Sequence, residues 1–147
     1  METSNRSAFL RRALLADATG SGACIAAILP FASPLSRLLQ LPVELLFGAG
    51  IALVPFVAFV VAVARPQQPR PVLVWAVIAS NFTWALASGA LALSRDVAPN
   101  ALGYAFIAVQ ALFVVAVAEL ELVGLRRAQG GLGGNSRRRN ASVGAPT

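Results

Sequence analysis

The sequence contains no histidine and no lysine, one cysteine, and only 12% charged residues. Because histidine is absent and Cys24 is the single thiol, the common ligand sets for transition metals and haem are missing. The absence of histidine also excludes histidine-based nucleophilic catalysis. A soluble domain carries about 25% charged residues, roughly twice the fraction found here. We therefore expect no metal, no cofactor, no enzymatic role and no water-facing surface over most of the chain.

Apolar residues dominate what is present: 57% of the 147 residues are hydrophobic, and the mean hydropathy is +0.72. A membrane-spanning helix needs ~20 apolar residues to cross ~30 Å of hydrocarbon. The chain has four such runs, at about residues 13–29, 43–64, 72–93 and 100–125. Barrel strands would alternate in polarity over ~10 residues, whereas residues 51–64 are apolar on every face. The sequence predicts an all-α, polytopic membrane protein with four transmembrane helices.

Short links, most of them containing proline, separate these runs. Pro30 is expected to end the first helix, and Ser33 with Pro34 is typical of the start of a short interfacial helix. Residues 65–71 form a proline-stiffened turn. Helices joined this closely should pack as antiparallel neighbours, which gives one up-down-up-down bundle over residues 1–127. Residues 128–147 are rich in glycine, serine and arginine, and we expect a disordered tail there.

The arginines fix an orientation, because all 12 basic residues are arginine and they are unevenly distributed. One side of the predicted bundle has only Arg37 and Arg95. The other side has the remaining ten: Arg6, Arg11, Arg12, Arg65, Arg70, Arg126, Arg127, Arg137, Arg138 and Arg139. Under the positive-inside rule, both termini and the 65–71 turn lie in the cytoplasm, and the bundle lies in the inner (plasma) membrane.

The net charge of +6 and the sequence pI of about 11.5 would indicate nucleic acid for a soluble protein. Here the arginines flank long apolar runs, so we expect them to contact the bilayer and its anionic lipid headgroups, and no nucleic acid. The residues expected to make these lipid contacts are Arg11, Arg12, Arg126, Arg127, Arg137, Arg138 and Arg139.

Two acidic residues, Asp17 and Glu119, lie within the predicted spans, where an ionisable side chain costs ~2.5–3.5 kcal/mol. Both lie at a similar shallow depth on the cytoplasmic side, and no arginine on the same helix has the i, i+4 spacing. One interpretation is a carboxylate pair from the first and fourth helices that binds a proton or a cationic substrate. The other is that both are interfacial carboxylates, either hydrated or paired with arginines. Glu121, nearer the headgroups, is interpreted as an interface residue.

Neutral polar residues also occur near mid-membrane. Asn81 and Gln110 are expected to hydrogen-bond across helices, at ~0.6–2 kcal/mol each. Trp84 lies one helical turn from Asn81, so a small polar and aromatic pocket can form there. The alternative interpretation is that these side chains only hold the helices together.

Three segments resemble a group of small four-helix bacterial inner-membrane proteins: LRRALLADA at 10–18, VWAVIASN at 74–81 and AELELVGLRR at 118–127. The resemblance covers about residues 8–127 and implies a topology but no activity. The chain is also similar in size to the small multidrug resistance transporters, which carry an essential glutamate inside their first helix. It departs from them because its first-helix acid, Asp17, is displaced toward the cytoplasm and its arginine bias is strong.

Two functions follow from these observations. The first is a structural or accessory component of a membrane assembly, as a homo-oligomer or within a larger complex. It rests on the tight links, the few buried polar groups and the lack of cofactor ligands. The alternative is a proton-coupled small-molecule transporter that uses Asp17 and Glu119.

Overall fold

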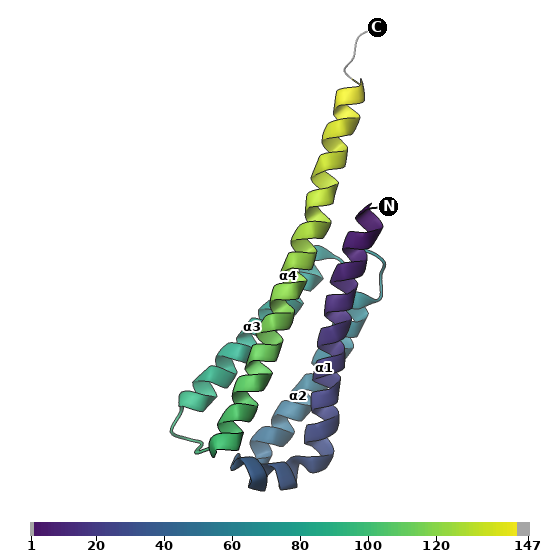
Figure 1. Cartoon of the computed structure of the whole chain (residues 1–147). Coiled ribbons are helices and arrows are strands. Elements are labelled where there is room, and N and C mark those ends of the chain that lie inside the picture. Colours follow the sequence, from purple (N-terminus) through teal and green to yellow (C-terminus); the bar gives the residue numbers. More distant parts are fainter. Residues whose placement is uncertain (1, 144–147) are drawn as a thin grey trace.

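The computed structural model describes the backbone of residues 2–143 and the side chains of residues 7–130. Within the described residues the chain forms four helices and no strands, arranged as the predicted up-down-up-down bundle (Figure 1). All four helices are long and apolar enough to cross a membrane. The prediction of an all-α, multi-pass membrane protein is therefore confirmed. The helices are α1 (Glu2–Leu39), α2 (Val43–Ala64), α3 (Pro71–Leu93) and α4 (Ala101–Val143).

The first helix does not stop at Pro30, as the sequence suggested, but bends there. Phe31 has non-helical backbone angles (φ −115°, ψ 19°), and α1 then continues to Leu39. The bend has a local cause, because the ring of Pro34 would clash with the carbonyl of the residue four positions earlier and leaves that carbonyl without its helical donor. Figure 1 shows the last turns of α1 lying across the end of the bundle.

A left-handed residue ends this bent segment. Gln40 has φ of 54°, and the Leu41 N–H donates to the Ser36 carbonyl at 3.2 Å. This is the bonding pattern of a Schellman motif, which satisfies a carbonyl that the end of a helix leaves free. The motif turns the chain directly into α2.

Asn100 joins the start of α4 to the end of α1. Its Oδ1 accepts from the Gly103 N–H at 2.9 Å, which makes it the N-cap of α4, and its Nδ2 donates to the Leu38 carbonyl at 2.8 Å. One side chain therefore satisfies an exposed helix terminus and holds the bent end of α1 in place.

Replacing Asn100 by alanine should lower the free energy of unfolding by about 1–2 kcal/mol, because both bonds are lost. Thermal unfolding in detergent, followed by circular dichroism, measures this. Thr83→Val is the control, since the Thr83 hydroxyl bonds only to the Ala79 carbonyl of its own helix. Equal melting of the two variants would contradict the capping role.

The order of the helices around the bundle differs from their order in the sequence. Helix α1 packs extensively against α2 and α4, and α4 packs against α1 and α3, whereas α2 and α3 barely touch. The expectation that consecutive helices pack side by side thus holds for α1–α2 and α3–α4 and is met only weakly for α2–α3. Residues 65–70 connect α2 and α3 as irregular backbone. The prolines of this link fix φ at their positions and remove backbone N–H donors.

Small residues set the close approach of α1 and α4. A Cβ atom added to Gly124 would lie 3.1 Å from the Cα of Leu10 and 3.2 Å from its Cβ. In a bilayer, where lipid is as apolar as leucine, such backbone proximity supplies much of the packing energy. The α1–α4 contact therefore forms the centre of the bundle.

The C-terminal part of α4 projects beyond the other helices (Figure 1). Residues 144–147 lie outside the described backbone, and residues 131–147 lie outside the described side chains. The expected disorder of residues 128–147 and the lipid contacts expected of Arg137, Arg138 and Arg139 remain predictions.

Candidate functional site

Two carboxyl groups are fully buried inside the bundle. Asp17 of α1 and Glu121 of α4 both have 0% exposed surface. They lie on the two helices that form the centre of the bundle, among the apolar side chains of Leu14, Ala18, Ala118 and Leu125. A buried carboxyl group is expensive unless it is neutral or fully hydrogen-bonded.

Asp17 is hydrogen-bonded through both oxygens. The Asn81 amide of α3 donates from Nδ2 to Oδ2 at 2.9 Å, and the Ser21 hydroxyl donates to Oδ1 at 3.2 Å. Ser21 is one turn further along α1, which is the spacing at which two helical side chains meet. Asn81 is 2% exposed. The carboxyl of Asp17 is therefore held from two helices.

Glu121 differs, because neither of its carboxyl oxygens has a hydrogen-bond partner among the described residues. The carboxyl lies within electrostatic range of Asp17, and the Asn81 amide lies near enough to interact with it, although without the geometry of a full hydrogen bond. Leaving a buried acceptor unsatisfied costs about 1–3 kcal/mol, and more if the group is charged. An unpaired carboxyl at this position, next to a second carboxyl, has no evident structural benefit.

The helical repeat explains why Glu121 is inside and Glu119 is not. Along α4 the buried residues Val114, Ala118, Glu121 and Leu125 recur at intervals of three and four, which defines the face toward α1. Each residue advances about 100° around a helix, so Glu119 points about 200° away from Glu121. Glu119 is exposed.

The structure thus brings together Asp17 and Asn81 of the expected site and leaves Glu119 outside it. Glu121 takes the place expected of Glu119, and Ser21 is a further member that the sequence did not single out. The depth of each residue in the membrane, counted along the helix, favoured Glu119. Burial depends instead on whether the residue lies on the face of α4 that packs against α1. The useful signal was that Glu121 lies three residues from both Ala118 and Gly124, the small residues of the packing face.

Trp84 and Gln110 form a second polar cluster. The Trp84 Nε1–H donates to Gln110 Oε1 at 3.2 Å, and Gln110 Nε2 donates to the Ser88 hydroxyl at 3.3 Å. These bonds connect α3 and α4, as expected for mid-membrane polar side chains. A cavity of about 220 Å³, lined by Ser21, Asn81 and Trp84 among others, reaches from the first cluster to the second.

Several arginines lie at the end of the bundle where α1 begins. The half-buried Arg11 donates from Nε to the Ala64 carbonyl at 3.0 Å, where a cation complements the C-terminal end of α2. The guanidinium of Arg127 lies over the Phe9 ring, 5.2 Å from its centroid. Arg12 and Arg126 are exposed.

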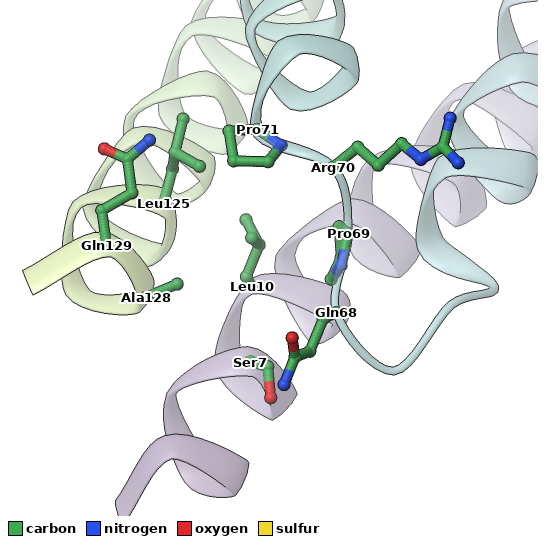
Figure 2. Close-up of a pocket in the computed structure, with 9 residues that line it drawn as sticks. All are labelled: Ser7, Leu10, Gln68, Pro69, Arg70, Pro71, Leu125, Ala128 and Gln129. Atoms are coloured by element: carbon green, nitrogen blue, oxygen red, sulfur yellow. The ribbon is translucent and has the colours of Figure 1, made fainter. Parts of the chain in front are cut away.

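A further cavity of about 230 Å³ lies at this same end, between α1, α4 and the α2–α3 link (Figure 2). Leu10 and Leu125 line it, with Gln68 and Gln129 nearer its rim. Figure 2 shows the Arg70 side chain pointing away from Leu10 and Leu125. Leu125 is one turn from Glu121, about 6 Å along α4 at 1.5 Å rise per residue, so the apolar side chain of Leu125 lies between this cavity and the buried pair.

A metal site finds no support in this arrangement, since no group of three or more His, Cys, Asp or Glu side chains gathers within the described residues. The site offers instead two carboxyls, an amide and a hydroxyl, which are groups that bind and release protons or donate hydrogen bonds. No protein-family model, curated protein or solved structure matches the chain. The functional argument therefore depends on the site itself.

Proposed function

We propose that the chain is a proton-coupled small-molecule carrier in which Asp17 and Glu121 form the proton site. The observation that carries this proposal is the Glu121 carboxyl, which is fully buried, has no hydrogen-bond partner among the described residues and lies beside a second carboxyl. Ionisable residues inside membrane helices commonly mark ion or proton pathways. Glu121 replaces Glu119 in the pair that the sequence suggested.

The chemistry of the pair supports proton binding. Two ionised carboxylates placed side by side away from water repel each other and lose their hydration. One proton held between them removes the repulsion and one of the two buried charges. Asn81, which donates to Asp17 Oδ2, favours keeping the remaining charge on Asp17. In this state Glu121 carries the proton.

The position of the pair supports transport as well as binding. On one side lies the cavity of Figure 2, behind the wall of Leu10 and Leu125. On the other side lies the cavity lined by Ser21 and Asn81. A proton bound to Asp17 would remove its negative charge and so weaken the hydrogen bond from Asn81. The Asn81 amide could then move. Proton binding would thereby change the lining of the second cavity, which Trp84 also contacts.

The accessory role expected from the sequence is the weaker candidate. It depended on few polar groups being buried, whereas Asp17, Ser21, Asn81, Ser88 and Glu121 are all buried in the bundle. Assembly as a homo-oligomer or within a larger complex remains a proposal that no observation favours.

We also propose an inner-membrane location with cytoplasmic termini and contact with anionic lipid. The support is the arginine distribution together with the fold. The start of α1, the end of α4 and the α2–α3 link lie at one end of the bundle (Figure 1). Arg11, Arg12, Arg65 and Arg70 belong to that end, whereas Arg37 belongs to the opposite end of α1. This is the distribution that the positive-inside rule describes for a cytoplasmic end.

Proteoliposomes that contain an entrapped pH dye test the carrier function. Tetraphenylphosphonium, benzoate and benzyl alcohol represent a cation, an anion and a neutral solute. We expect at least one of them to drive proton movement in the natural protein above that in protein-free liposomes, and none to exceed this background in Glu121→Gln. Glu119→Gln is the matched control, because it makes the same change on the opposite, exposed face and should behave like the natural protein.

Two results would overturn the carrier proposal. One is the absence of proton movement with all three solutes. The other is the same proton movement in Glu121→Gln as in Glu119→Gln.

A further inference from the structure

A lateral groove opens between α2 and α3 because these two helices barely touch. It contains a cavity of about 300 Å³, at the lower end of the range for small-molecule sites in proteins. All four helices line it: α1 contributes Ile28, α2 contributes Leu45, α3 contributes Leu91 and α4 contributes Ile107, among others. Leu45 and Leu91 stand on opposite walls.

The chemistry of the lining is specific. Among the residues that the structure describes, no charged side chain lines the cavity, and the polar side chains that line it are Trp84, Ser88 and Gln110. The bond from Trp84 uses one lone pair of Gln110 Oε1, and the bond to Ser88 uses one of the two hydrogens on Nε2. A primary amide has two hydrogens and two lone pairs. Gln110 thus retains one donor and one acceptor position toward a further group.

We infer that this groove binds a neutral, mostly apolar small molecule with a single hydrogen-bonding group, such as an alcohol, a phenol or an amide. The apolar body lies against Ile28, Leu45 and Ile107, and the polar group bonds to Gln110 and Ser88. A charged molecule would lose its hydration and find no opposite charge in the lining. A lipid acyl chain has no hydrogen-bonding group and would leave the remaining donor and acceptor of the Gln110 amide without a partner.

A molecule bound in this groove would be the substrate of the proposed carrier. This assignment rests on the proposed carrier function. The cavity that adjoins Asn81 also contacts Trp84, so Trp84 stands between the solute groove and the proton site. Binding in the groove can therefore be tested separately from proton coupling.

Fluorescence quenching of Trp84 measures occupancy directly. The exposed Trp75 is first replaced by phenylalanine, which leaves Trp84 as the one tryptophan of the chain. The Trp75→Phe protein in lipid nanodiscs is titrated with 4-bromophenol, whose bromine quenches tryptophan on contact. Bromobenzene, which lacks the hydroxyl group, is the matched probe. We expect saturable quenching by 4-bromophenol at concentrations where bromobenzene gives only linear quenching.

Variants in the Trp75→Phe background locate the bound hydroxyl. Gln110→Met should weaken 4-bromophenol binding about tenfold, the effect of losing one to two hydrogen bonds. Ser88→Ala removes less side chain and should weaken binding in the same direction, which provides a second test if Gln110→Met folds poorly. Thr83→Val, outside the lining on the same helix, should leave binding unchanged.

Equal quenching by the two probes would overturn the inference, as would unchanged binding in both Gln110→Met and Ser88→Ala. Saturating quenching by brominated acyl chains in the nanodisc, with no competition from 4-bromophenol, would assign the groove to lipid instead. Binding should persist in Glu121→Gln. A protein that binds 4-bromophenol but moves no protons would therefore contradict the carrier function alone.

Discussion

Replacing Asn81 by leucine is expected to lower the free energy of unfolding by about 2–4 kcal/mol. Leucine is similar in size, so the change removes the amide and leaves the packing volume nearly intact. Asp17 Oδ2 then loses the donor at 2.9 Å while remaining fully buried. The second carboxyl of Glu121 nearby raises the cost, because the amide no longer offsets the negative charge of the site.

Unfolding in detergent, followed by circular dichroism, gives this value, with Thr83→Val as the control on the same helix. Combining Asn81→Leu with Asp17→Leu should recover most of the lost stability, because removing both partners of a buried hydrogen bond leaves no unsatisfied group. If Asn81→Leu unfolds at the same point as Thr83→Val, the Asn81–Asp17 bond does not stabilise the bundle.

Replacing Gly124 by leucine is expected to lower the free energy of unfolding by about 2–3 kcal/mol, through overpacking of the α1–α4 contact. A Cβ atom there would already lie 3.1 Å from the backbone Cα of Leu10, so the helices must move apart. Glu121 is one turn from Gly124, and the same movement separates it from Asp17. The variant should therefore lose stability and proton coupling together.

Gly89→Leu is the matched control, since a Cβ atom at Gly89 meets nothing within 4 Å. Leucine there should leave stability unchanged or raise it by up to about 0.8 kcal/mol, because leucine is the better helix former. Equal effects of the two substitutions on unfolding would show that α1 and α4 do not approach closely at Gly124.

The four helices could be predicted from the sequence because each is a run of about 20 apolar residues. Residues 43–64 and 72–93 were placed within one residue of α2 and α3. The bend at Phe31 was expected as the end of one helix followed by a short second helix, because the prolines indicate a break but do not decide whether the two segments join. The Schellman motif and the Asn100 bonds, which hold the resumed segment, depend on contacts between distant parts of the chain.

The candidate site was predictable in part. Asp17 and Asn81 stood out because polar side chains inside spans need partners. Glu121 was passed over in favour of Glu119, because depth along a helix can be counted from the sequence whereas the inward face depends on which helices pack together. In an alanine-rich and valine-rich helix, both faces are apolar enough to be buried.

No pattern in the sequence predicts the groove between α2 and α3. A short link between two helices favours their contact, and only the central position of α1 and α4 keeps these two apart. Trp84 and Gln110 were expected near mid-membrane, but the unused capacity of Gln110 becomes visible only when its bonds to Trp84 and Ser88 are known.

The central claim is that Asp17 and Glu121 share a proton inside the membrane. Infrared spectroscopy of the protein in lipid at neutral pH tests it, because a protonated carboxyl has a C=O stretch distinct from that of a carboxylate. We predict this band in the natural protein and in Glu119→Gln, and its loss in Glu121→Gln. Absence of the band from the natural protein, or its persistence in Glu121→Gln, would contradict the claim.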